Sequence, residues 1–181
     1  MIKKAPQGLR PPAGRLGSGS PCDSCTRPCL AGPERLVGLG FRCWLAGYQT
    51  GDIACWEQAW DTFARELGPT RAKAAVTELS CWVRSVSHDA QRPITVYPNP
   101  CATFCRDECL AVSMIAAHQQ GADCDARASA FALLQSSMVD DVVATSQAFA
   151  SVLTGIDVVL SPNAIAGLAS RQQQTLIGTA H

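Results

Sequence analysis

Large apolar residues recur at intervals of three and four along the first half of this sequence. The clearest run consists of Ile53, Trp56, Trp60, Phe63 and Leu67. An α-helix has 3.6 residues per turn, so this spacing places all five side chains on one face of a helix. A half-buried strand would instead alternate with a period of two, and this run does not. The run therefore predicts an amphipathic helix that buries one face against a neighbour.

The same periodicity predicts further helices on both sides of this run. Turn residues separate them, with Asp52 as the expected N-cap of the second helix and Asn99-Pro100 as the expected start of the fourth. Residues 94–97 form a candidate short edge strand. The fold class expected is all-α, a bundle of about five to six helices. The predicted helices cover approximately residues 33–50, 53–67, 70–87, 100–120, 124–137 and 138–155.

The helical pattern occupies only the middle of the 181-residue sequence. Residues 1–32 are rich in Pro, Gly and Ser and lack hydrophobic periodicity, which predicts a flexible N-terminal arm. Residues 33–160 are predicted to form the helical bundle. Residues 161–181 are predicted to form a short helical turn and a frayed tail. Hydrophobic residues make up 47 % of the sequence, enough for one domain to bury a core.

Charge and hydropathy exclude several kinds of partner. The 15 basic and 15 acidic residues balance, whereas a nucleic-acid-binding surface needs a basic surplus, so we expect no nucleic-acid partner. No apolar segment is long enough for a membrane span, and none follows Lys3-Lys4 as an export signal would require. We therefore expect a cytoplasmic protein. Most of the basic residues are arginine and alanine is abundant, as is typical of a high-GC bacterial genome.

Ten cysteines are the main compositional signal. In a reducing compartment, many cysteines indicate metal or redox chemistry rather than structural disulfides. Cys101, Cys105 and Cys109 are spaced to lie along one face of the expected fourth helix. Neighbouring thiols would then be about 6 Å apart along the axis and the outer pair about 12 Å. Either the first turn after Pro100 unwinds so that the three thiols share a metal, or they contribute to successive sites for a soft ion.

The position of these thiols also affects their expected acidity. A helix N-terminus near Cys101 and Cys105 lowers a thiol pKa through its dipole. Arg106 would add to that effect, and Asp107 and Glu108 would oppose it. We expect a mild lowering of the pKa.

A second group of thiols, Cys22, Cys25 and Cys29, lies in the arm. A Cys-x2-Cys pair commonly begins a zinc or iron–sulfur site. Because only three thiols are local, a fourth ligand must come from Cys43, a partner chain or water. Three further cysteines each precede a tryptophan, at the edge of a predicted apolar face. They either turn toward a shared neighbour or pack at the rim of the core; they are Cys43, Cys55 and Cys81.

The remaining polar residues give no catalytic signature. The sequence has no His-Glu-x-x-His motif and no phosphate-binding glycine loop, so a non-catalytic protein is favoured. His118 is expected to be a structural histidine. Arg42, Arg84 and Arg106, which lie near cysteines, are expected on a solvated face.

The Cys101-x3-Cys105-x3-Cys109 spacing on an expected helix resembles that of the cysteine-rich four-helix-bundle copper-storage proteins. The resemblance covers about these nine residues and implies an all-α bundle in which the three thiols bind metal.

These observations favour a cytoplasmic, cysteine-rich metal-binding protein for storage, delivery or sensing. The metal is Cu(I), Zn(II) or an iron–sulfur centre. One alternative is a thiol redox protein that uses Cys101 or Cys105 as its nucleophile. Another is a non-catalytic accessory protein whose N-terminal arm binds a protein partner. The candidate metal ligands are Cys101, Cys105, Cys109, Cys22, Cys25 and Cys29.

Overall fold

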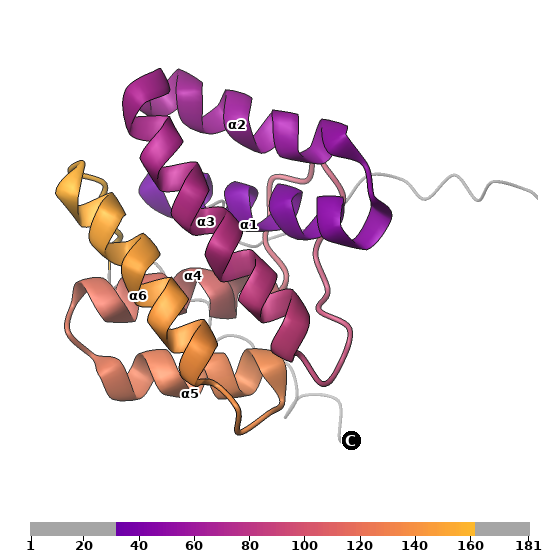
Figure 1. The fold of residues 1–181 in the computed structure, drawn as a ribbon, viewed down its shortest axis with the longest axis vertical. Helices are drawn as coiled ribbons and strands as arrows, with labels where there is room; N and C mark the ends of the chain where they lie inside the picture. Colours follow the sequence, from indigo (N-terminus) through magenta and orange to yellow (C-terminus); the bar gives the residue numbers. More distant parts are fainter. Residues whose placement is uncertain (1–31, 162–181) are drawn as a thin grey trace, which may run out of the picture.

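The computed structural model describes residues 32–161, and over this range it contains six α-helices and no strand. The predicted all-α bundle of five to six helices is therefore confirmed (Figure 1). The predictions made for the arm and for the C-terminal tail fall on residues outside the described range. The helices are α1 (Pro33–Thr50), α2 (Ile53–Leu67), α3 (Pro69–Asp89), α4 (Arg106–Gln119), α5 (Asp123–Leu134) and α6 (Asp140–Gly155).

Helices α1 and α6 each pack against three other helices of the bundle. Helix α1 packs against α2, α3 and α4, while α6 packs against α3, α4 and α5. In Figure 1, α3 crosses in front of α1 and α6 crosses in front of α4. The indole of Trp82 on α3 lies at the centre, 5.3 Å from the ring of Phe41 on α1 and 5.6 Å from the ring of Phe149 on α6. All three aromatic residues are fully buried, so the core is built around this aromatic stack.

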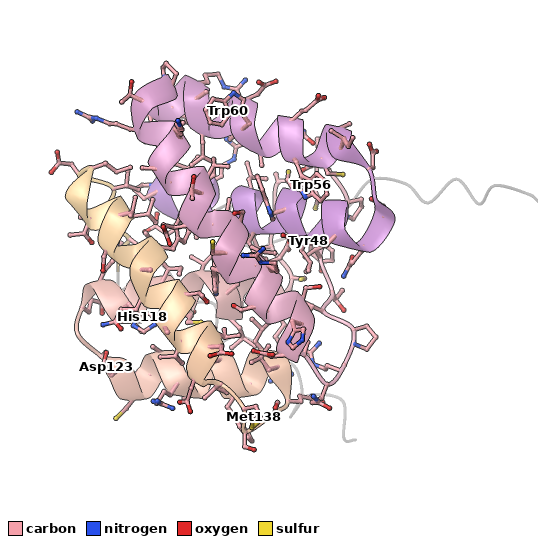
Figure 2. All side chains as sticks on the ribbon, in the orientation of Figure 1. Tyr48, Trp56, Trp60, His118, Asp123 and Met138 are labelled. Carbon is pink, nitrogen blue, oxygen red and sulfur yellow. The ribbon has the colours of Figure 1, made fainter. Side chains whose placement is uncertain are left out.

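The apolar run on α2 is buried in part. Phe63 is fully buried, whereas Ile53 at the start of the helix is 63 % exposed. Trp56 packs edge-on against Tyr48 of α1 and donates from its indole nitrogen to the carbonyl of Trp44 at 3.2 Å (Figure 2). Gly47 permits this approach, because a Cβ at that position would overlap the indole ring. The run thus fastens α2 onto α1.

The ends of the first helices follow the expected local chemistry. Gly51 ends α1 in the left-handed conformation, at φ 72°, which glycine adopts without strain. The side chain of Asp52 then accepts a hydrogen bond from the backbone nitrogen of Ala54 at 2.9 Å, as an N-cap should. The predicted boundary between these two helices is confirmed.

The predicted start of the fourth helix is wrong. Helix α4 begins at Arg106, and residues 90–105 form a loop without regular structure that includes Asn99-Pro100. The N-cap of α4 is Cys105, whose backbone nitrogen donates to the Glu108 carboxylate at 2.7 Å. The Cys105 sulfur in turn accepts from the backbone nitrogen of Glu108, so the two residues form a capping box. This cap marks the start of α4 and keeps the helix from extending toward Pro100. Residues 94–97 are not paired as a strand.

His118 lies in the interior, as expected for a structural histidine. Its side chain is 2 % exposed, and its Nε2 is hydrogen-bonded to the hydroxyl of Ser146 on α6 at 2.9 Å. Burial lowers the pKa of His118, and the opposing charge of Asp123, 3.9 Å away and largely exposed, only partly offsets this (Figure 2). The fold therefore favours the neutral imidazole over the protonated form.

We predict that the free energy of unfolding decreases as the pH falls from about 7 to 5. In this range the unfolded chain protonates His118 more readily than the folded protein does, because the folded pKa is lowered. Urea unfolding at several pH values measures the effect, and each unit of pKa difference contributes about 1.4 kcal/mol. The variant His118→Gln should lose this part of the pH dependence. An unchanged pH profile in the variant would contradict the assignment.

Candidate functional site

The loop of residues 90–105 is the most unusual element of the described chain. Connections longer than about 12–15 residues without secondary structure are uncommon in compact domains and are usually functional or disordered. This one is held by side chains along α1. Gln49 donates to the carbonyl of Ile94 at 3.0 Å, and Asn99 donates to the sulfur of Cys43 at 3.1 Å. The loop therefore runs antiparallel to α1, from its C-terminal end toward its N-terminal end.

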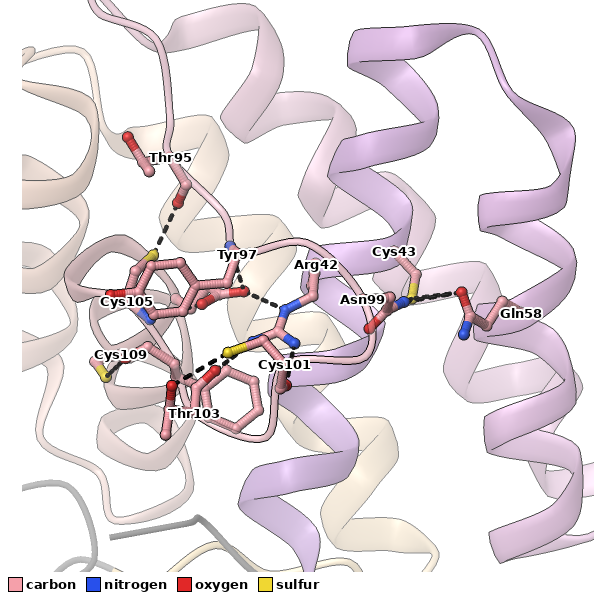
Figure 3. A network of polar contacts seen from close by, with 12 residues as sticks. Arg42, Cys43, Gln58, Thr95, Tyr97, Asn99, Cys101, Thr103, Cys105 and Cys109 are labelled. Atoms are coloured by element: carbon pink, nitrogen blue, oxygen red, sulfur yellow. Dashed lines mark hydrogen bonds and ion pairs between the residues drawn. The ribbon is translucent and has the colours of Figure 1, made fainter. Parts of the chain in front are cut away.

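Arg42 of α1 is the central residue in this attachment. Its side chain is 1 % exposed, and its Nε donates to the carboxylate of Glu108, which is fully buried. The two terminal nitrogens donate to the carbonyls of Cys101 and Thr103, each at 2.6 Å (Figure 3). One guanidinium thus joins α1, the loop and α4. The expectation that Arg42 lies on a solvated face is wrong.

Apolar packing supports the same attachment. The guanidinium carbon of Arg42 lies 4.8 Å from the centroid of the Phe104 ring, within cation–π range. The ring of Phe104 occupies the space that a Cβ at Gly38 would fill. Phe104 and Cys109 form a small apolar cluster with Leu39, apart from the main core. Close packing therefore fixes the end of the loop against the N-terminal half of α1.

Asp107 ties the first turn of α4 to the start of the loop. Its two carboxylate oxygens each accept a hydrogen bond from Arg92 at 2.7 Å, and one also accepts from the backbone nitrogen of Thr95 at 2.8 Å. Burial acts to raise the pKa of Asp107, but the contacts with Arg92 and Thr95 outweigh it and leave the pKa lowered. Asp107 is therefore an ionised structural residue.

Cys105 is a buried thiol rather than an activated one. It is 6 % exposed, and its sulfur donates to the carbonyl of Thr95 at 3.0 Å. Burial raises the pKa of Cys105 to about 12, despite the hydrogen bonds that its sulfur receives from the backbone of Glu108 and Asp107. The expected mild lowering of its pKa by the helix N-terminus is wrong. An open cavity of about 410 Å³ adjoins it, lined in part by Arg92 and Arg106.

The structure does not place Cys101, Cys105 and Cys109 along one face of a helix, because only Cys109 lies within α4. Cys101 lies in the loop, half-buried, with its sulfur 3.3 Å from the Thr103 hydroxyl. Cys105 caps α4, and Cys109 lies on its first turn, 8 % exposed. Within residues 32–161, no three His, Cys, Asp or Glu side chains are grouped to hold a metal ion. The other predicted ligands lie outside the described residues; they are Cys22, Cys25 and Cys29.

Of the three cysteines that precede tryptophans, Cys43 is the one whose contacts include the loop. It is 3 % exposed, and burial raises its pKa, although the hydrogen bond from Asn99 opposes the shift. Asn99 also donates to the side chain of Gln58 on α2 at 2.8 Å. Cys55 and Cys81 are half-buried on α2 and α3. Of the two alternatives for these thiols, convergence of all three on a shared neighbour is therefore not observed in the described residues.

Sequence reasoning missed the residues that position these thiols. Glu108 follows Cys105 by three residues, which matches the spacing of a capping box with cysteine in place of serine or threonine. That signal predicts the observed start of α4. No local signal distinguishes Arg42 from a surface arginine, because its partners come from residues 101–108.

Comparison with known proteins finds no matching family model, no matching curated protein and no matching solved structure. None of the helices in the described part of the chain is long and apolar enough to cross a membrane.

We predict that Arg42→Met lowers the free energy of unfolding by about 3–5 kcal/mol, because it leaves the buried Glu108 carboxylate without its counter-charge. The double variant with Glu108→Leu should lose less than the sum of the single losses. Denaturant unfolding measures all three. Arg127→Met is the control, since it breaks an exposed pair with Asp140 and should cost less than about 1 kcal/mol. Equal losses in Arg42→Met and the control would contradict the central role of Arg42.

We predict that Cys105 of the native protein reacts with iodoacetamide at pH 8 at least about 100-fold more slowly than the exposed Cys124. A thiol with a pKa of about 12 is ionised at pH 8 in only about one molecule in ten thousand. Mass spectrometry of the labelled peptides measures each rate, and labelling in denaturant provides the reference. Comparable native rates at the two sites would refute the buried, protonated state of Cys105.

Proposed function

We propose that this chain is a cytoplasmic, cysteine-rich metal-binding protein that holds a soft or borderline ion through thiolates. The candidate ligands are Cys101, Cys105 and Cys109, in the loop and at the start of α4, together with the arm thiols Cys22, Cys25 and Cys29. The observation that carries the proposal is the loop of residues 90–105, which the buried Arg42–Glu108 pair fixes through the carbonyls of Cys101 and Thr103.

This attachment supports a binding role because it holds part of the ligand set in place before any metal arrives. Metal sites need ligands whose positions are fixed by surrounding contacts. Cys101, Cys105 and Cys109 have such support from contacts with α1 and within α4, although the described residues alone do not group three ligands. Further ligands must therefore come from other cysteines of the chain or from a partner.

Metal binding also suits these thiols better than nucleophilic redox chemistry. A redox nucleophile needs a thiolate with a lowered pKa and access to solvent. Cys105 is buried and its pKa is raised to about 12. A bound cation displaces the thiol proton and itself stabilises the thiolate, so coordination does not require a thiolate before the metal arrives, whereas nucleophilic attack does. The proposed metals remain Cu(I), Zn(II) or an iron–sulfur centre.

A second candidate function is that of an accessory protein that binds a partner. Large apolar side chains are exposed near the α5–α6 connection, where Phe131 is 58 % and Met138 is 76 % exposed. Met138 is at the lower edge of the molecule in Figure 2. A stable partner that co-purifies with a metal-free chain would favour this function over metal binding.

We predict that the full chain, purified without oxygen, contains bound metal and that replacing the candidate ligands removes it. The first variant replaces Cys101, Cys105 and Cys109 with serine, and the second replaces the three arm cysteines. Elemental analysis gives the metal content per chain, and the absorption spectrum distinguishes copper–thiolate and iron–sulfur centres from zinc. The control replaces Cys81 and Cys124, which lie outside both groups. Unchanged metal content in both triple variants would disprove the proposed function.

A further inference from the structure

We propose that the cavity at the start of α4 binds a small organic carboxylate. The cavity has a volume of about 410 Å³ and lies where the loop, the first turn of α4 and the C-terminal end of α5 meet. Arg92 and Arg106 bind the carboxylate group, and the rest of the cavity holds the organic part of the ligand. This inference goes beyond the proposed metal binding and does not depend on it, because the donors are cationic side chains rather than thiolates.

The contacts of Arg92 leave one edge of its guanidinium without a partner. A guanidinium carries five N–H groups in one plane. The Nη1 of Arg92 donates to the carbonyl of Pro93 at 3.0 Å and to one oxygen of Asp107 at 2.7 Å, and Nη2 donates to the other oxygen at 2.7 Å. These contacts use the end of the group that carries Nη1 and Nη2. The N–H groups left over, on Nε and on Nη2, are parallel and lie on the adjacent edge.

This remaining edge of Arg92 is suited to an oxyanion. Its Nε is buried and has no hydrogen-bond partner, which is costly for a donor. Two parallel N–H groups match the two oxygens of a carboxylate. In the proposed complex the carboxylate reaches this edge from the cavity, where the Arg92 side chain is 21 % exposed. Because Asp107 already holds the guanidinium in place, little further ordering is needed when a ligand binds.

The charge of the cavity favours a ligand with a single negative charge. The charged side chains that line it are Arg92, Arg106 and Asp107. The carboxylate of Asp107 neutralises Arg92, whereas Arg106 is exposed and makes no ion pair within residues 32–161. Cys105 also lines the cavity and adds no charge, because its thiol is protonated. One positive charge therefore remains, which a carboxylate balances and a doubly charged phosphate would exceed.

Two uncharged polar side chains, of Thr95 and Gln135, complete this part of the lining. Thr95 is fixed on both sides, since its backbone nitrogen donates to Asp107 and its carbonyl accepts from the thiol of Cys105 (Figure 3). Gln135 ends α5 at a φ of 52°, where glycine is usual, and supplies an amide that glycine would lack. Small-molecule sites commonly measure about 300–1,000 Å³, so the cavity has room for more than the carboxylate group.

The first test is an NMR titration of the reduced, metal-free full chain with benzoate at neutral pH and constant ionic strength. We expect saturable shifts of the backbone amides that surround the cavity, and a shift of the Nε–H resonance of Arg92 as it gains a hydrogen bond. Benzamide has nearly the same shape without the charge and should bind at least about tenfold more weakly. Inorganic phosphate should also bind more weakly than benzoate. No saturable binding of benzoate, equal binding of benzamide, or tighter binding of phosphate would overturn the inference.

The second test compares variants in the same titration. Arg106→Gln removes the unpaired charge and should weaken benzoate binding at least about fivefold. Arg92→Lys keeps its charge but loses the paired N–H groups, and should weaken binding by a similar factor. The control is Arg71→Gln, which removes an exposed charge from the first turn of α3, outside the cavity, and should leave the affinity unchanged.

Circular dichroism checks that each variant is folded. If Arg92→Lys does not fold, the Nε–H resonance of Arg92 in the wild-type chain tests the same contact. Unchanged benzoate affinity in Arg106→Gln, or an equal loss in the control, would overturn the inference. Because metal is excluded from the titration, none of these results bears on the proposed metal binding.

Discussion

The buried contact between Arg42 and Glu108 is the interaction on which the described architecture of the loop depends. A buried ion pair adds little net stability, because desolvation of two charges offsets their attraction. Its structural effect is larger. The two terminal nitrogens of Arg42 donate to the carbonyls of Cys101 and Thr103, and the Glu108 carboxylate accepts from the backbone nitrogen of Cys105. The pair therefore sets where the loop ends and where α4 begins.

A long segment without helix or strand must satisfy its backbone polar groups in another way. In residues 90–105 the side chains of α1 and α4 do so, with Gln49 and Arg42 on one side and Asp107 and Glu108 on the other. The result is a fixed loop on a helical scaffold. The same contacts give the cysteines different environments, so that Cys105 is buried as a hydrogen-bond donor whereas Cys101 stays half-buried.

Local sequence determined most of the helices but not this loop. The apolar periodicity of α2 and the Gly51-Asp52 boundary act over a few residues, so they could be predicted from the sequence. Asn99-Pro100 also matches the local pattern of a helix start. Contacts from Arg42, about sixty residues away in the sequence, nevertheless hold the residues that follow in a non-helical conformation. The cysteine spacing therefore predicts a shared helix face that the tertiary structure does not form, because α4 begins only at Arg106.

The position of the thiols relative to the core bears on how metal binding and folding are coupled. Small zinc domains unfold without metal because their ligands replace a hydrophobic core. In this chain the core is formed by the aromatic stack of Phe41, Trp82 and Phe149, and none of the candidate ligands takes part in it. The loop is likewise held by protein contacts. A bundle held in this way would keep its fold when a metal leaves the proposed ligands.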